Sequence, residues 1–158
     1  MSSQNDIEKL VKKLKHKKAE VRIEAIEDLI ELNNPEAVEP IIECLKDPDS
    51  DVKYQAIIAL GEFKSLKGVI PLISLLKDKD PDIREAAAEV LGDLGDKRAV
   101  DPLIALLKDD EAPVRVQAVE ALGKLGDPKA RTPIHELLND EDPLVQEKAS
   151  EAIQKNNW

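Results

Sequence analysis

The chain has 158 residues, of which 42% are hydrophobic but only 2% aromatic, so an aliphatic core is expected. Its 33 acidic and 23 basic side chains give a net charge of −10. This balance argues against DNA or RNA as the main ligand, because phosphate binding depends on Lys and Arg. With one cysteine and no apolar run near the roughly 18 residues that span a bilayer, we expect a cytoplasmic protein without disulfides or membrane contact.

A repeat of 31 residues runs through the chain without insertion or deletion. Copies of one pattern begin at Val38, Val69, Val100 and Arg131, and a degenerate copy begins at Ile7. A fixed period of this length is typical of solenoids, in which small units stack on their neighbours. We therefore expect a single domain over residues 1–158, with repeats at about 7–37, 38–68, 69–99, 100–130 and 131–158.

Each repeat is predicted to begin with a short helix, which covers about residues 102–108 in the fourth copy. Proline holds one position near the start of this helix, where a missing N–H breaks no helical hydrogen bond. These prolines are Pro40, Pro71, Pro102 and Pro133. The acidic residues that follow predict a turn and a carboxylate cap for the next helix, in which Pro81 and Pro143 suit the first position.

A longer second helix completes each repeat, and its core residues recur at spacings of three and four. They are Val114, Ala118, Leu122 and Leu125 in the fourth repeat, and Ile83, Ala87, Leu91 and Leu94 in the third. Gly95 and Gly126 suit left-handed caps after this helix. Gly92 and Gly123, in its last turn, allow a neighbouring helix to approach closely.

Polar residues replace apolar ones in the two outer repeats. Lys13 stands where inner copies have leucine, and Asn156 stands where Leu94 and Leu125 stand in theirs. The end repeats of a solenoid must face water, so we expect the first and last repeats to act as caps of a complete, monomeric domain.

The copies resemble the HEAT-like repeats of phycobilin lyases over about residues 7–155. The shared pattern is Val-x-Pro-Leu-Ile-x-x-Leu-x-Asp-x-Asp, followed by Val-Arg-x-x-Ala-x-x-Ala-Leu-Gly-x-Leu-Gly-Asp. The resemblance implies an all-α fold, a right-handed α-α superhelix of about five helical hairpins. It also implies a polar ladder between repeats, carried by Asp49, Asp80 and Glu111 with Lys53, Arg84 and Arg115, and interrupted at Lys18 and Gln146.

In this family the second helices line a concave surface, which implies a groove for a partner. The residues assigned to this groove are Glu20, Ile23, Glu24, Glu27, Asp51, Tyr54, Gln55, Ile58, Asp82, Glu85, Glu89, Val116, Gln117, Glu120, Leu144 and Glu147. Because they are mostly acidic, the predicted partner is a basic or mixed protein or peptide surface, with Tyr54 as the best apolar anchor. The competing interpretation is an ordinary charged helix surface.

No catalytic, cofactor-binding or metal-binding residue is predicted, and the protein is expected not to be an enzyme. Deoxyhypusine hydroxylases resemble this scaffold, but the positions of their His-Glu pairs hold no histidine here. His135 replaces isoleucine and is assigned to packing, Cys44 replaces leucine and is assigned to the core, and His16 is placed in a solvated turn.

Three alternatives remain open at this stage. The chain is an adaptor that binds a partner in the acidic groove, a phycobilin-lyase-like subunit that acts on a tetrapyrrole or its carrier protein, or an engineered scaffold without a natural ligand. In addition, a run of lysines lies in the first half of the first repeat, and it is either a solvated cap or a surface that contacts acidic groups. Its members are Lys9, Lys12, Lys13, Lys15, Lys17 and Lys18.

Overall fold

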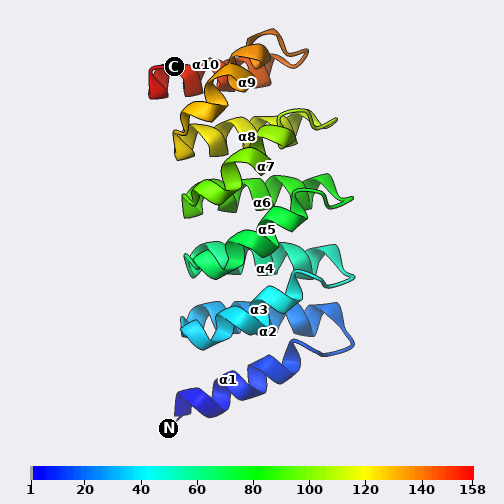
Figure 1. Ribbon diagram of the computed structural model, residues 1–158. Helices are drawn as coiled ribbons and strands as arrows, with labels where there is room; N and C mark the ends of the chain where they lie inside the picture. The colour runs from blue at the N-terminus through cyan, green and yellow to red at the C-terminus, as the bar shows by residue number, and fades with distance from the viewer. Residues whose placement is uncertain (1) are drawn as a thin grey trace. The chain divides into compact units, whose positions relative to one another are not determined.

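The computed structural model describes residues 2–158, with side chains from Asn5 onward (Figure 1). This part of the chain forms ten α-helices and five one-turn 3-10 helices, and contains no strand. Contacts between Cα atoms divide the chain into two compact units, Met1–Pro71 and Leu72–Trp158, named the first and second unit. The predicted all-α class of repeated helical hairpins is confirmed.

In the first unit, the hairpin of α1 and α2 is followed by the hairpin of α3 and α4. The elements are α1 (Ser2–Lys13), α2 (Ala19–Leu32), η1 (Pro35–Ala37), α3 (Val38–Cys44), α4 (Ser50–Glu62) and η2 (Leu66–Gly68). The two longer helices, α2 and α4, pack against each other, while α1 packs on α2 and α3 on α4.

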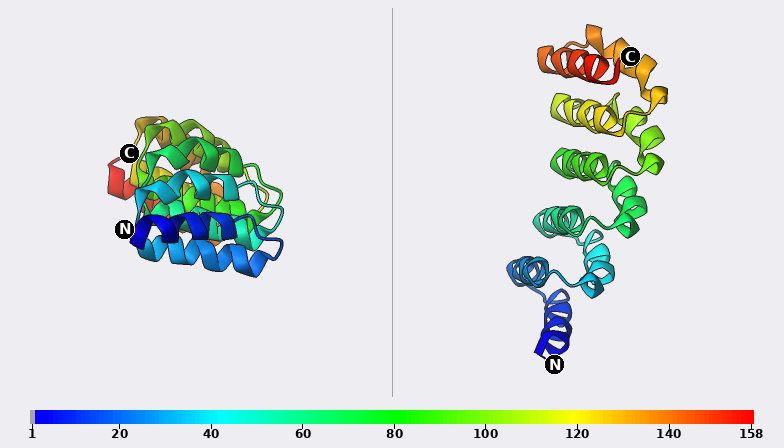
Figure 2. Two further views of the ribbon diagram at one scale, coloured as in Figure 1. Left: turned by 90° about the horizontal axis from the view of Figure 1, so that it is seen from below. Right: turned by 90° about the vertical axis from the view of Figure 1, so that its left-hand side faces the viewer.

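The second unit repeats this arrangement after α5 (Val69–Leu75), within which the boundary between the units falls. Its elements are α6 (Pro81–Leu94), η3 (Lys97–Ala99), α7 (Val100–Leu106), α8 (Ala112–Leu125), η4 (Pro128–Ala130), α9 (Arg131–Glu136), η5 (Leu137–Asn139) and α10 (Pro143–Asn156). Helices α6, α8 and α10 stack as one layer, and α7 and α9 form a second layer beside them (Figure 2, right). We call α2, α4, α6, α8 and α10 the second helices.

Aspartate side chains start most of the second helices. The Asp49 carboxylate accepts hydrogen bonds from the amides of Asp51 and Val52 at 3.0 and 3.3 Å, and Asp142 makes the same pair of bonds in α10. Pro81 begins α6 directly after its cap, as predicted. Glu111 holds the cap position of α8 without such a bond, since its longer side chain is a poorer cap than Asp.

Short 3-10 turns, which were not predicted from the sequence, end each of the first four repeats. Asn34, Asp96 and Asp127 each accept a hydrogen bond from the amide two residues later, at 2.9 to 3.0 Å. An Asn or Asp side chain that folds onto its own backbone in this way forms a tight turn. The turn leads the chain directly from one repeat into the first helix of the next.

The core of both units is aliphatic, as predicted. Its largest fully buried side chains are Ile26, Leu29, Ile41, Ile57, Leu60 and Val52 in the first unit, and Leu72, Ile83, Leu91, Leu103, Leu122 and Ile134 in the second. Leu94 and Leu125 are only half-buried and do not belong to this core. They end their helices, where less of the neighbouring repeat covers them.

The glycines of the second unit behave as the sequence predicts. Gly95 and Gly126 adopt φ values of +69° and +63° after α6 and α8, a conformation that costs little without a side chain. At Gly92 a Cβ would lie 2.8 Å from the Cα of Ala121, so α6 and α8 can pack this closely only with glycine there.

The last repeat ends in a specific contact. Asn156, half-buried, donates its side-chain amide to the carbonyl of Gly123 at 3.1 Å and to that of Ala152 at 2.9 Å. Asn156 therefore provides a hydrogen bond to a carbonyl in the last turn of α8. Lys13, the predicted polar substitution in the first repeat, is exposed.

Candidate functional site

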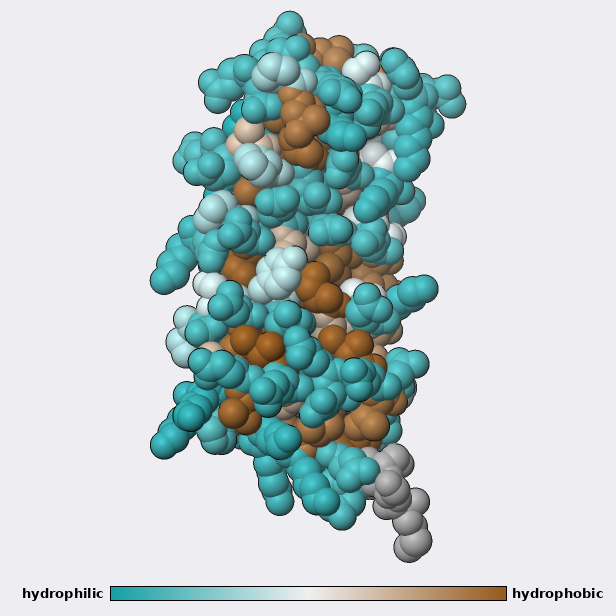
Figure 3. Space-filling model, turned by 180° about the vertical axis from the view of Figure 1, so that it is seen from behind, coloured by the Kyte–Doolittle hydropathy of each residue, from teal (hydrophilic) through white to brown (hydrophobic). Residues whose placement is uncertain are grey.

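In each unit, the outward side of the second helices carries the predicted partner-binding residues. Figure 3 shows the side chains on this side of each unit. In the first unit, Glu20, Glu24 and Glu27 are exposed on α2, and Ile23 is half-buried among them. On α4, Asp51 and Tyr54 are exposed, with Gln55 and Ile58 half-buried. Because α2 and α4 pack side by side, these residues share one surface, the second-helix face of the first unit.

The second unit presents the corresponding face on α6, α8 and α10. Asp82, Glu89, Leu144 and Glu147 are exposed, whereas Glu85, Val116, Gln117 and Glu120 are half-buried. Burial raises the pKa of Glu85, and the neighbouring carboxylates Asp82 and Glu89 add to the rise. Three acidic side chains therefore lie close together on α6.

Lysines of α8 and α10 neutralise part of this second face. Lys124 Nζ lies 2.6 Å from Asp93, an equivalent position one repeat earlier. Lys148 Nζ lies 3.3 Å from Glu120 and 2.9 Å from Glu151, and these two bonds raise the pKa of Lys148, that from Glu151 most. The sequence does not predict that these lysines pair with carboxylates of the face.

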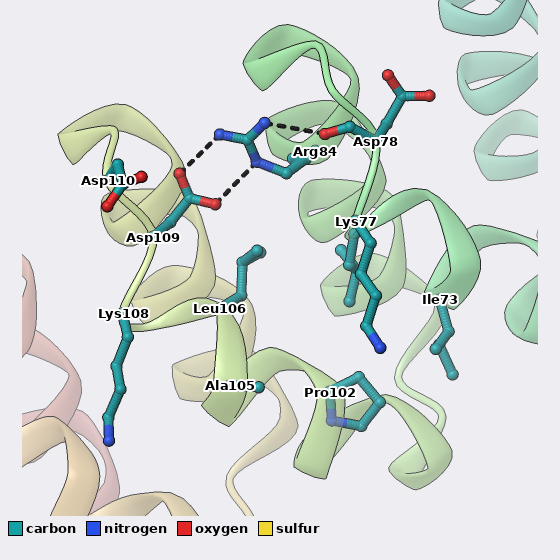
Figure 4. A pocket seen from close by; sticks show the side chains of 11 residues that line it. Ile73, Lys77, Asp78, Arg84, Pro102, Ala105, Leu106, Lys108, Asp109 and Asp110 are labelled. Atoms are coloured by element: carbon teal, nitrogen blue, oxygen red, sulfur yellow. Dashed lines mark hydrogen bonds and ion pairs between the residues drawn. The ribbon is translucent and has the colours of Figure 1, made fainter.

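A second polar feature joins neighbouring repeats. The guanidinium of Arg84 donates to both carboxylate oxygens of Asp109 at 2.8 Å and to the carbonyl of Asp78 at 2.9 Å (Figure 4). Arg115 makes the same three bonds one repeat later, to Asp140 and to the carbonyl of Asp109. We call these arginine–aspartate pairs the ladder.

The ladder extends into the first repeat, which the sequence analysis missed. Arg22 lies at the position of Arg84 and pairs with Asp47 at 2.7 Å, also donating to the carbonyl of His16. The chain therefore carries this contact from its first repeat, and Lys18 does not interrupt it. The missed signal was the period itself, since Arg22 precedes Lys53 by one repeat length.

The prediction of the ladder carboxylates was wrong, because the aspartates that the arginines contact lie two residues earlier in the sequence. Asp49 and Asp80 cap α4 and α6, and Glu111 occupies the cap position of α8, so none of them receives the arginine. The ladder uses the preceding turn residues Asp47, Asp109 and Asp140, each of which also accepts a backbone amide two residues on. The predicted interruption at Gln146 is confirmed, because its neutral amide donates to the carbonyl of Asp140 and cannot form the ion pair that an arginine makes.

The carboxylates of Asp109 and Asp140 are held in the charged form. Desolvation alone would raise the pKa of Asp109, but hydrogen bonds from Arg84 and from the Glu111 amide outweigh it and lower that pKa. The same balance lowers the pKa of Asp140 beside Arg115. Charge-assisted bonds from a guanidinium fork are among the stronger ones in proteins, so the ladder serves as a rigid structural link.

An open cavity of about 620 Å³ lies beside the ladder in the second unit, and both apolar and charged side chains line it (Figure 4). Ile73, Pro102 and Leu106 are among its apolar lining residues, and Lys77 and Lys108 are among the charged ones. A smaller cavity of about 440 Å³ occupies the equivalent place in the first unit and includes Cys44. These cavities recur because the repeats do.

The remaining candidate groups show no reactive arrangement. Cys44 is buried, its thiol donates to the Pro40 carbonyl at 3.5 Å, and burial raises its pKa to about 11. His135 is half-buried on α9, with Nε2 out of solvent and without a hydrogen-bond partner in the described chain. His16 is exposed, as predicted. Across the described side chains, no group of His, Cys, Asp or Glu could hold a metal ion.

None of the described helices is long and apolar enough to cross a membrane.

Residues 7–73, 43–121 and 69–154 each match the sequence profile of HEAT repeats. The chain belongs to the HEAT-repeat family. Comparison with curated proteins finds no match. Among solved structures, the HEAT repeats are similar to a chain of the complex of CpcE and CpcF of phycocyanin lyase from Nostoc sp. PCC7120, with 27% identity and a TM-score of 0.82. That match covers 95% of this chain but 64% of the other, so this chain spans less than two thirds of its relative.

Two engineered proteins share the fold. One, described only as an engineered protein, has 26% identity and a TM-score of 0.72 over 96% of this chain and 79% of its own. The other is a designed armadillo repeat protein in complex with the peptide (KR)4, with 20% identity and a TM-score of 0.72 over 94% of this chain and 80% of its own. At that identity the second likeness shows the fold alone.

Proposed function

We propose that this HEAT-repeat protein is a non-enzymatic, cytoplasmic adaptor that binds a basic or mixed protein or peptide on the face of its second helices. The observation that carries the proposal is the composition of that face in each unit, where exposed carboxylates surround a few exposed or half-buried apolar side chains. A surface of one sign speeds the capture of an oppositely charged partner.

Two relatives fit this proposal. The designed armadillo repeat protein was solved with a peptide of alternating Lys and Arg, and the phycocyanin lyase relative was solved as a complex of two proteins. Both repeat proteins therefore hold another chain. In this chain, the exposed carboxylates of the second helices are what favours a basic ligand.

A peptide of four Lys-Arg pairs is a direct probe. We expect it to bind the full chain at low salt, as measured by fluorescence anisotropy, and to bind more weakly at higher salt because exposed charges are screened. The triple variant Glu24→Lys, Glu85→Lys and Glu89→Lys should lose most of this binding.

A matched control replaces three exposed carboxylates of α3, α7 and α9 with lysine: Glu43, Asp101 and Glu136. It therefore has the same net charge as the first triple variant. It should bind the peptide much better than the first variant does. Equal loss in both variants would mean that net charge alone attracts the peptide, and would contradict a binding face on the second helices.

A phycobilin-lyase-like subunit is the second candidate, supported by the 27% identity to the Nostoc relative. Such a role needs a pocket that holds a tetrapyrrole, and the chain has only three aromatic side chains, Tyr54, Phe63 and Trp158. Titration with a free bilin tests this function. A shift in the bilin absorbance spectrum would support it, and an unchanged spectrum would speak against it.

A further inference from the structure

The second-helix face of the first unit carries acidic charges that no Lys or Arg of α2 or α4 neutralises, although Glu31 shares a hollow with Lys9 and Lys13 of α1. Its carboxylates lie at exposed positions of α2 and α4, and they are Glu20, Glu24, Glu27, Glu31, Asp51 and Glu62. Neither helix places a Lys or Arg among them on this face, since Arg22 turns to the ladder and Lys53 is buried. None of the six carboxylates forms an ion pair within the part of the chain whose side chains are described. Their charge is therefore available to a partner.

The second unit differs at equivalent positions. Glu27 on α2 corresponds to Glu120 on α8, three repeat lengths later, and Glu120 is held by Lys148. Glu31 corresponds to Lys124, which itself holds Asp93. Lysines of the chain thus occupy the place that a partner's basic side chains would take, and they leave the α8 and α10 part of the face nearly neutral.

The first unit also offers an apolar anchor among its carboxylates. Tyr54 is 42% exposed on α4, and the half-buried Ile23 holds the equivalent position on α2, which packs against α4. Ile58 lies one helical turn beyond Tyr54 and is also half-buried. In Figure 3, apolar surface shows between hydrophilic side chains on this side of the first unit. An exposed aromatic ring can pack against an apolar side chain and can also stack with the planar guanidinium of arginine.

We infer that the partner docks on the α2–α4 face of the first unit, through a segment in which a bulky apolar side chain lies between Lys and Arg residues. The apolar side chain packs on Tyr54 and Ile23, and the flanking basic groups pair with the free carboxylates. This inference rests on the proposed function and adds to it the location of the site and the pattern of the ligand.

Two synthetic peptides test the pattern on the full-length protein. In one, a leucine lies between three basic residues on each side; in the other, glycine replaces the leucine. We expect the leucine peptide to bind more tightly, and Tyr54→Ala to reduce its affinity about tenfold, as for a hot-spot residue. The same variant should barely change the affinity of the glycine peptide.

The equivalent residues Glu27 and Glu120 form a matched pair for the location. Glu27→Gln removes a free carboxylate and should weaken binding about two- to fivefold at low salt, whereas Glu120→Gln removes one already held by Lys148 and should weaken binding clearly less. The double variant Lys124→Gln, Lys148→Gln releases carboxylates of the second unit. It should add a second, weaker site, visible as amide shifts in α8 and α10 on NMR titration.

Two results would overturn the inference. If the leucine peptide shifts the amides of α6, α8 and α10 in the wild type and leaves those of α2 and α4 unmoved, the location is wrong while the proposed function stands. If neither peptide binds, and the Lys-Arg peptide does not bind either, the proposed function fails together with the inference.

Discussion

Arg84 and Asp109 lie 25 residues apart, yet two hydrogen bonds of 2.8 Å join the guanidinium of one to the carboxylate of the other. Both side chains are largely shielded, with exposed fractions of 14% and 10%. The pair connects the start of one second helix to the turn before the next. It is therefore a contact between repeats rather than within one.

Removing the arginine should destabilise the protein markedly. Arg84→Gln leaves the shielded Asp109 carboxylate without its partner, and we expect a loss of about 2 kcal/mol in the free energy of unfolding. Urea unfolding followed by circular dichroism measures it. Arg98→Gln is the control, since Arg98 is 51% exposed and pairs with Asp96 within one turn rather than between repeats, so its loss should destabilise the protein much less.

The ladder also predicts a dependence of stability on pH. The pKa values of Asp109 and Asp140 are lowered in the folded state, so their ion pairs stabilise the fold above the ordinary Asp pKa of about 4. This contribution should disappear as the pH falls through the lowered folded-state values. In the variant Asp109→Asn, Asp140→Asn, stability should start lower at neutral pH and decline less on acidification.

Urea titrations of both proteins between pH 7 and pH 2 provide the comparison. Parallel stability curves for the wild type and the double variant would contradict this account of the ladder.

Gly92 should tolerate no side chain. The Cβ of alanine would lie 2.8 and 2.9 Å from the Cα and Cβ of Ala121, so α6 and α8 would have to move apart. Overpacking of this kind costs about 1–3 kcal/mol. Gly123→Ala is the control, because its Cβ would lie 3.3 Å from the Ala152 Cβ and needs a smaller adjustment. Thermal unfolding should rank Gly92→Ala below Gly123→Ala and the wild type.

Cys44 should be unreactive in the folded protein. Its thiol is buried, and a pKa of about 11 leaves almost no thiolate at pH 8. Labelling with a thiol-reactive dye at pH 8 should be at least about a hundredfold slower in buffer than in concentrated urea. Fast labelling of the folded protein would show that the thiol is accessible, and would contradict its assignment to the core.

Most of the fold could be predicted from the 31-residue repeat period. The spacing of apolar residues located the helices, and proline and glycine positions located several of their ends, such as Pro81 and Gly95. The 3-10 turns were missed because a single turn has no periodicity. In the turn at Asp96, the Ala99 amide donates to the Asp96 carbonyl and the Arg98 amide donates to the Asp96 carboxylate.

The contacts between repeats were harder to predict. Asp47 and Asp49 lie in the same turn, and composition cannot tell which carboxylate faces the arginine and which caps the helix. The pairing of Lys148 with Glu120 likewise depends on which positions of adjacent helices face each other, information that a 31-residue alignment does not contain. The acidic character of the face was readable from the sequence, whereas its partial neutralisation was not.

The repeat at 100–130 brings both a ladder donor and a ladder acceptor: Arg115 donates to Asp140 of the following repeat, while Asp109 accepts from Arg84 of the preceding repeat. An in-frame duplication of such a copy would therefore arrive with both halves of its joint already matched to the flanking copies, and no compensating mutation would be needed. Gene duplication can lengthen a chain of this kind one copy at a time. Gln146 donates to the carbonyl of Asp140 in its own repeat, but it lacks a guanidinium that could bind a carboxylate of a following repeat. Adding a copy after this repeat would therefore require Gln146→Arg.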